Sequence, residues 1–109
     1  MIVTETLKDV IDTHTLILLY LDTLKSKTGG WESAGIMVIA KTCLADRATV
    51  RRNLQGDGKR HPYEKSLMGK GLVIEVVMGA RTEYMITEKG HEEVSGIKSD
   101  MARAVGEFA

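Results

Sequence analysis

The stretch "LADRATVRRNLQGDGKRHPYEKSL", residues 44–67, decides the interpretation of this chain. Asp46 is a strong N-cap residue, because its carboxylate can accept a hydrogen bond from an unpaired N–H group at the start of a helix. The following "RATVRRNLQ" predicts a helix in which Val50 and Leu54, four residues apart, face inward. The outer face of this helix then carries Arg47, Arg51, Arg52 and Gln55.

A glycine-rich basic insert interrupts the chain after this helix. The segment "GDGKRHP" has two glycines and one proline in seven residues, a composition typical of a turn. We expect Pro62 at the first position of a short helical piece, "YEKSLMGKG". The insert, residues 56–62, brings Lys59, Arg60 and His61 to the end of the basic helix. These side chains suit phosphate contacts, but a tolerated surface insertion explains them as well.

A long amphipathic helix is predicted before this region, over residues 4–27, where apolar residues recur at three- and four-residue steps. Leu16, Leu19 and Tyr20 widen its apolar side beyond one face, so it must be covered from two directions. Either the chain itself or a second subunit can provide that cover. The glycines of "KTGG" are expected to end the helix.

A short second helix is expected between this helix and the basic one. Trp31 is predicted to be a core anchor beside a short strand, and Ser33 is a plausible N-cap. Ile36, Ile39 and Cys43 then follow a helical spacing.

A β-hairpin and a last helix are predicted after the insert. "LVIEVVM" and "TEYMIT" are rich in strand-forming residues and are joined by "GAR". The outer face of the hairpin, carrying some of Val73, Val77 and Met85, is more apolar than solvent requires. Thr87 is expected to cap a helix over residues 88–108, whose apolar stripe is Val94, Ile97, Met101, Val105 and Phe108. Three glycines, each about 1 kcal/mol worse than alanine, weaken this helix: Gly90, Gly96 and Gly106.

Positive charge is concentrated in the middle of the chain. The 109 residues have a net charge of zero and fit one domain. Residues 41–70 nevertheless hold eight basic and three acidic side chains, a net charge of +5. This distribution is expected if one face meets a polyanion, although a solvated basic helix also accounts for it.

Three pieces of the sequence, in the same order, resemble winged-helix proteins. "IAKTCLADRATVRRNL" resembles the helix-turn-helix of bacterial and archaeal winged-helix regulators. "LMGKGLV" resembles the end of their recognition helix, and "EYMITEKGHEEV" resembles the segment that leaves the wing in MarR- and PadR-like transcriptional regulators. The resemblance covers about residues 13–95 and implies an α+β, mostly α, winged helix-turn-helix: a three-helix core, a β-hairpin wing and a C-terminal helix. The insert departs from the family, whose recognition helix usually runs on without a break.

The resemblance implies sequence-specific binding to double-stranded DNA by a small homodimeric transcriptional regulator. The helix 4–27 and the helix 88–108 would form the dimer. One α-helix fits a major groove, and arginine and glutamine can pair with guanine and adenine there. The expected DNA-binding residues are Arg47, Thr49, Arg51, Arg52 and Gln55 on the helix, Lys59 and Arg60 in the insert, and Arg81 at the wing tip. Two alternatives stay open: a winged-helix module for protein–protein contact in a larger assembly, and a plasmid or viral replication initiator.

Other functional classes find little support in the residues. The candidate ligands His14, Cys43, His61 and His91 are widely separated and share no metal-ligand spacing. No phosphate loop or nucleophile elbow is present, so neither an enzyme nor a cofactor is expected. The single cysteine, the lack of a signal peptide and the six-residue length of "LILLYL" predict a cytoplasmic protein without a membrane partner.

Overall fold

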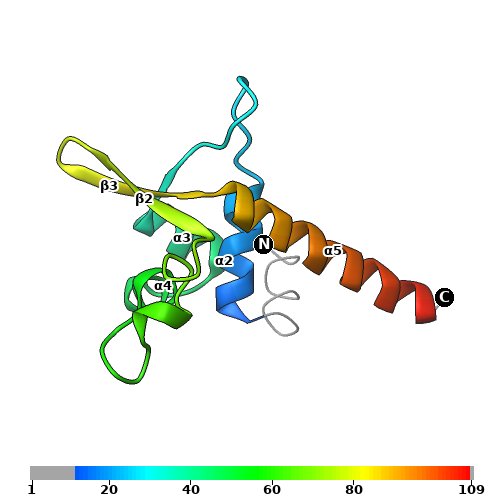
Figure 1. Ribbon diagram of the computed structural model, residues 1–109. Helices are drawn as coiled ribbons and strands as arrows, with labels where there is room; N and C mark the ends of the chain where they lie inside the picture. Colours follow the sequence, from blue (N-terminus) through cyan, green and yellow to red (C-terminus); the bar gives the residue numbers. More distant parts are fainter. Residues whose placement is uncertain (1–11, 109) are drawn as a thin grey trace.

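The computed structural model describes residues 12–108. The chain is a small α+β unit, as predicted, and its described elements are arranged around a central helix (Figure 1). In chain order they are α2 (Thr13–Asp22), β1 (Ala34–Gly35), α3 (Ile36–Cys43), α4 (Arg47–Gln55), the 3₁₀ helix η1 (Tyr63–Lys65), β2 (Val73–Met78), β3 (Arg81–Ile86) and α5 (Glu88–Phe108). The three strands form one antiparallel sheet in the order β1-β3-β2.

Helix α2 is shorter than the helix predicted over residues 4–27. Asp12 is its N-cap, with Oδ1 accepting a hydrogen bond from the Thr15 N–H at 2.8 Å. Its C-terminal end is at Asp22, where the Thr23 hydroxyl donates to the Tyr20 carbonyl. The prediction was therefore wrong for residues 23–27, which belong to a loop closed by a bridge between Lys25 and Trp31. Residues 4–11 of the predicted helix lie outside the described part of the chain.

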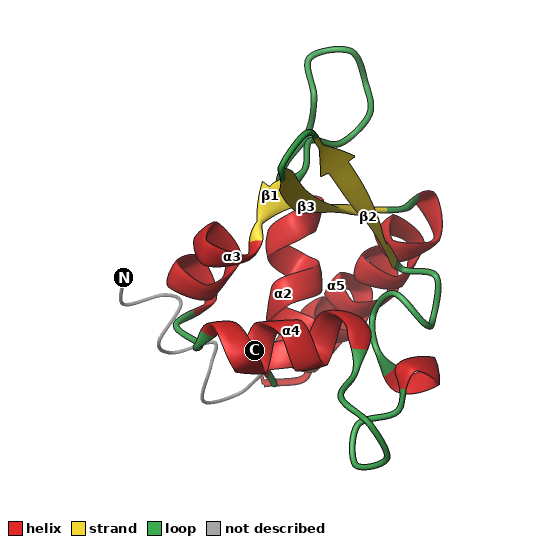
Figure 2. Ribbon diagram, turned by 90° about the vertical axis from the view of Figure 1, so that its left-hand side faces the viewer, coloured by secondary structure: helices red, strands yellow, loops and turns green. Residues whose placement is uncertain are grey.

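The wide apolar side of α2 is covered by the chain itself. Leu16, Ile17, Leu18 and Leu21 are all buried. Helices α3, α4 and α5 and strand β3 pack around them, so that α2 stands in the middle of the fold (Figure 2). The chain itself therefore covers most of the apolar side of the described helix, with Leu19 and Tyr20 partly buried against the core.

The hairpin has the predicted strands but a shorter link. Met78 pairs with Arg81, so the link is Gly79-Ala80 and not "GAR". Gly79 has a φ of 64°, which suits the first position of a two-residue hairpin turn. Val73 was expected as a candidate for the outer face, but it is buried on the core side opposite Ile86.

Helix α5 has the predicted bounds and the predicted cap. The Thr87 hydroxyl accepts a hydrogen bond from the Gly90 N–H at 3.0 Å and donates to the Gly71 carbonyl at 2.7 Å. The sequence suggested that Gly90 weakens the helix, but the packing of the helix requires a glycine there. A Cβ at this position would lie 2.2 Å from the Leu72 carbonyl oxygen, so only glycine permits the helix to approach that backbone. The C-terminal half of α5 projects away from the rest of the molecule (Figure 1).

Ser33 has a different role from the one predicted. The N-cap of α3 is Gly35, and no side chain caps this helix. The Ser33 hydroxyl instead donates to Glu83 Oε1 at 2.6 Å, which fastens the start of β1 to its partner strand β3. The sheet pairing therefore decides the orientation of Ser33.

Candidate nucleic-acid interface

Helices α3 and α4 are joined by a tight turn whose backbone is fixed on both sides. Leu44 closes α3 in the left-handed region with φ 54°, the one non-glycine residue with positive φ among residues 12–108. Asp46 then caps α4, with Oδ1 accepting from the Thr49 N–H at 2.6 Å, as predicted. Val50 and Leu54 are fully buried, also as predicted. The opposite side of α4 therefore faces outward.

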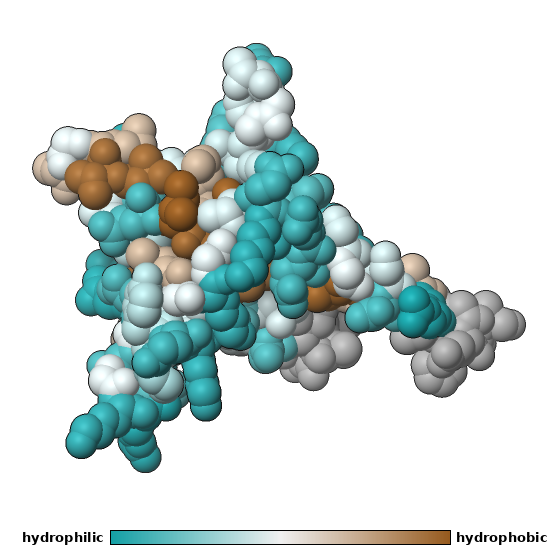
Figure 3. All heavy atoms as spheres, viewed as in Figure 1, coloured by the Kyte–Doolittle hydropathy of each residue, from teal (hydrophilic) through white to brown (hydrophobic). Residues whose placement is uncertain are grey.

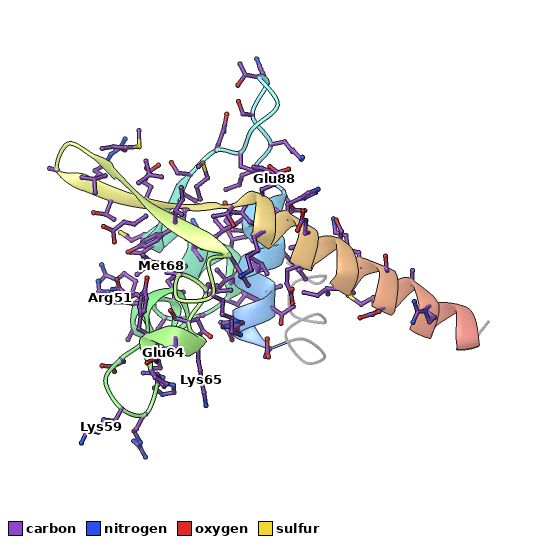
Figure 4. The ribbon with its side chains drawn as sticks, in the orientation of Figure 1. Arg51, Lys59, Glu64, Lys65, Met68 and Glu88 are labelled. Atoms are coloured by element: carbon purple, nitrogen blue, oxygen red, sulfur yellow. The ribbon has the colours of Figure 1, made fainter. Side chains whose placement is uncertain are left out.

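The five α4 residues predicted to contact DNA are not equally accessible. Arg47 and Arg51 are exposed, whereas Thr49, Arg52 and Gln55 are half-buried. Arg51 extends outward from α4 (Figure 4). Its positive charge is close enough to Tyr84 to lower the pKa of the tyrosine, against larger effects that raise it. That pKa is raised chiefly by burial and further by the charge of Glu75. Arg51 thus lies on the side of α4 that faces the hairpin.

The hairpin and the insert flank α4 on one side of the molecule. Figure 2 looks toward α4, which lies across the front below the hairpin, with the insert beyond its C-terminal end. Arg81, the first residue of β3 after the turn, has a side chain that is 72% exposed, and it lies 4.0 Å from Glu83 Oε2. Lys59 is at the tip of the insert (Figure 4). The predicted residues of the helix, wing and insert therefore share one side of the fold.

The insert is a closed loop. Helix α4 ends at Gln55, Gly56 is its C-cap with a φ of 81°, and the Asp57 N–H donates to the His61 carbonyl at 2.6 Å. A Cβ on Gly56 would lie 2.6 Å from that same carbonyl oxygen, so the closure requires glycine. The predicted helical piece "YEKSLMGKG" is reduced to η1, and Pro62 is its N-cap and not its first residue. The reason is that the chain after η1 binds α4, with Leu67 and Met68 donating to the carbonyls of Asn53 and Leu54.

Two residues beside the insert were not among the DNA-binding residues predicted from the sequence. His14 of α2 and Lys65 of η1 line a cavity together with Arg52 and Arg60. Lys65 belongs to the basic segment 41–70, whose positive charge was the sequence signal that could have pointed to it. His14 is distant in sequence, and only the packing of α2 against α4 brings it there.

The described residues contain no group of three or more histidine, cysteine, aspartate or glutamate side chains placed to hold a metal ion. Within the same part of the chain, no helix has both the length and the apolar character that a bilayer span requires.

The family of the chain follows from a comparison with protein-family models. A model described as EarA-like matches residues 13–97. The chain belongs to the EarA-like family. The EarA-like region runs from the start of α2 into α5, and so includes α4, the insert and the hairpin. No curated protein and no solved structure shows significant similarity to this EarA-like chain.

Proposed function

We propose that this EarA-like chain is a winged-helix protein that binds double-stranded DNA sequence-specifically, as a homodimer that regulates transcription. The observation that carries the proposal is the grouping of exposed cations on one side of the fold. Arg51 and Lys59 lie there (Figure 4), Arg47 and Arg81 are exposed residues of α4 and of the hairpin, which are on the same side, and α5 projects toward the opposite side (Figure 1).

Helix α4 suits the role of a recognition helix. An α-helix with its side chains is about 10–12 Å in diameter and therefore fits the major groove, which is roughly 12 Å wide. The buried Val50 and Leu54 hold one side of the helix to the core, and the capped N-terminus fixes its start. Arg47 and Arg51, one turn apart and exposed, are the residues that we assign to base contacts. Arginine can donate two hydrogen bonds to guanine.

The wing and the insert suit phosphate contacts. Arg81 is next to a two-residue turn, and Lys59 is at the tip of a closed loop, so both cations project beyond the surface of α4. Most protein–DNA hydrogen bonds go to the backbone, and such contacts fix the register of the helix on the duplex. Helix α4 would therefore recognise bases in the centre, and the hairpin and the insert would contact the DNA backbone on the two flanks.

Helix α5 supports the homodimer. Val94 is buried and Ile97 half-buried against the body, but Met101, further along the same stripe, is 39% exposed. The projecting half of the helix (Figure 1) needs packing, because short isolated helices are marginal in water and Gly96 weakens this one further. We infer that the projecting halves of two α5 helices pair. Sedimentation of a monomer at micromolar concentration would contradict this pairing.

The test of the proposed function is a selection from random duplexes, followed by binding measurements at about 50 mM and about 200 mM salt. We expect an enriched sequence with two-fold symmetry and half-sites about 34 Å apart or a multiple of that distance. We also expect affinity to fall steeply with salt, because phosphate contacts release counterions. Selection without enrichment, or equal binding of selected and scrambled duplexes, would contradict the proposal.

The second candidate function is protein–protein contact through the hairpin, which a specific observation favours. Ile74 and Met78, on one face of β2, are 43% and 46% exposed, Val77 on the other face is 67% exposed, and apolar residues extend along the hairpin (Figure 3). Contiguous exposed apolar surface is typical of interaction sites. The double substitution Ile74→Thr and Val77→Thr separates the two functions, because it leaves the cations of α4 in place. If the double variant still binds the selected duplex, the DNA function is supported. If the wild-type chain selects no duplex, protein–protein contact through the hairpin is the better candidate.

A further inference from the structure

A cavity of about 290 Å³ lies between α2, the C-terminal end of α4, the insert and η1. Its size is near the lower limit of small-ligand pockets, which suits a compact group. The side chains that matter for its chemistry are His14, Arg52, Asn53, Arg60, His61 and Lys65. The cavity thus joins segments from four parts of the fold.

The lining is cationic and contains no carboxylate. Arg52, Arg60 and Lys65 contribute three positive charges, and no aspartate or glutamate lines the cavity. Among the described residues, no ion pair within 4.0 Å involves any of the three. Asp57 lines an adjoining hollow with Arg52 and Arg60. Cations gathered in a concave surface raise the local concentration of anions.

Arg52 provides a second, independent observation. Its Nε is buried and has no hydrogen-bond partner within the described chain. A buried donor on a charged group without an acceptor is costly, so its presence at the cavity needs an explanation. An anion bound in the cavity would offset the positive charge of this guanidinium, although Nε itself has no surface open to the cavity.

We propose that this cavity binds a phosphate group. The planar guanidinium of arginine matches two oxygens of a phosphate, and Arg52 and Arg60 approach the cavity from α4 and from the insert. The group has two possible sources: the backbone of bound DNA, or a free phosphate compound. The first source rests on the proposed function, whereas the second does not.

The experiment is an NMR titration of the full chain with inorganic phosphate, with pyrophosphate and with the selected duplex, at constant ionic strength in chloride. We expect saturable shifts of the backbone resonances of residues 52–53 and 60–66. Arg60→Gln combined with Lys65→Gln should weaken this binding by about tenfold or more, because charge-assisted hydrogen bonds are lost. Lys27→Gln, which removes an exposed cation from the loop between α2 and β1, is the matched control and should leave the binding unchanged.

The two sources give different results in this titration. Saturation by the duplex, with pyrophosphate displaced from the same resonances, identifies the DNA backbone. Saturation by phosphate or pyrophosphate, with no response at residues 60–66 to the duplex, identifies a free phosphate compound. The inference is overturned if no probe gives saturable shifts there, or if the double variant responds as the wild type does. The resonances of residues 47–51 report DNA binding by α4 separately, so failure of the cavity and failure of the proposed function are distinguishable.

Discussion

His91 Nδ1 lies 2.7 Å from Asp22 Oδ1, and this contact joins the start of α5 to the end of α2 across 69 residues of sequence. Asp22 is buried, and its other oxygen lies 3.8 Å from Lys98 Nζ. The ring of His91 packs against Trp31 with 5.3 Å between centroids, and Lys25 Nζ lies 4.6 Å over the Trp31 ring. One cluster therefore fixes α5 and the loop after α2 against the same point of the core.

Asp22→Asn should destabilise the fold. The substitution keeps the shape of the side chain but removes the charge that His91 and Lys98 approach, and hydrogen bonds to charged groups contribute about 1.5–3 kcal/mol. We expect the free energy of unfolding in urea to fall by about that amount. Asp100→Asn, at an exposed position of α5, should stay within about ±0.5 kcal/mol of wild type. Equal stability of wild type and Asp22→Asn would show that the contact contributes nothing.

Two glycines of α5 should respond to alanine in opposite directions. At Gly90 a Cβ would clash with the Leu72 carbonyl oxygen at 2.2 Å and with Ile86 Cγ1 at 2.6 Å. Gly90→Ala should therefore destabilise the chain, by about 1–3 kcal/mol as for other overpacked sites. A Cβ at Gly96 meets nothing within 4 Å, so Gly96→Ala should stabilise the helix by up to about 1 kcal/mol. Thermal unfolding of the two variants measures both effects, and a shift in the same direction for both would refute the packing described for Gly90.

The acid sensitivity of the fold should depend on His14. Burial, and then the charge of Lys70, hold the pKa of His14 below its ordinary value of 6.5, and Lys70 Nζ lies 3.3 Å from His14 Nε2. Because the folded pKa is lowered, protonation favours the unfolded chain. The contribution to stability is fully present above pH 6.5 and is lost as the pH falls toward the folded pKa.

Lys70→Gln tests this relationship directly. Removing the cation should raise the pKa of His14 toward 6.5, while burial still keeps it lower. NMR titration of the imidazole resonances measures the change, and Lys27→Gln is the control with an exposed, remote cation. Identical titration of His14 in the wild type and in Lys70→Gln would mean that the lysine charge has no effect on the histidine.

Local signals in the sequence predicted much of the fold. Asp46, Thr87 and the strand-forming runs of the hairpin act on neighbouring residues, so the cap of α4, the cap of α5 and the strands could be placed from the sequence. The end of α2 could not, because the apolar spacing continues through Leu24 while the Lys25–Trp31 bridge turns the chain away. A single bridge between residues six positions apart leaves no periodic signal.

The candidate site was predictable in part for the same reason. The outward cations of α4 follow from the buried positions of Val50 and Leu54, and the structure places Arg47 and Arg51 on the surface. The closure of the insert is a single hydrogen bond between Asp57 and His61, which has no periodic signal, and the approach of His14 depends on contacts between segments distant in sequence. The contact between His91 and Asp22, 69 residues apart, likewise has no signal in the sequence.

The insert should contribute affinity more than sequence choice. Changing Lys59 and Arg60 together to alanine should weaken binding to selected and scrambled duplexes by similar factors and flatten the salt dependence, because phosphate contacts carry no sequence information. Stability should change by less than about 0.5 kcal/mol, since both side chains are exposed. Paired salt titrations measure the effect. A loss confined to the selected duplex would mean that the insert contacts bases, and no loss on either duplex would mean that it is a surface insertion without a role in binding.

DNA recognition by α4 is tested most directly by the affinity of the selected duplex for the variant with Arg47→Ala and Arg51→Ala, measured by fluorescence anisotropy beside the wild type. Both arginines are exposed on α4, so the variant should fold normally, which circular dichroism checks. If they contact guanines, each should contribute about 1–3 kcal/mol, and the preference for the selected duplex over a scrambled one should largely disappear. Lys27→Ala, an exposed cation in the loop between α2 and β1, should leave that preference unchanged. If the double variant binds the selected duplex with wild-type affinity and preference, α4 does not read DNA and the account is wrong.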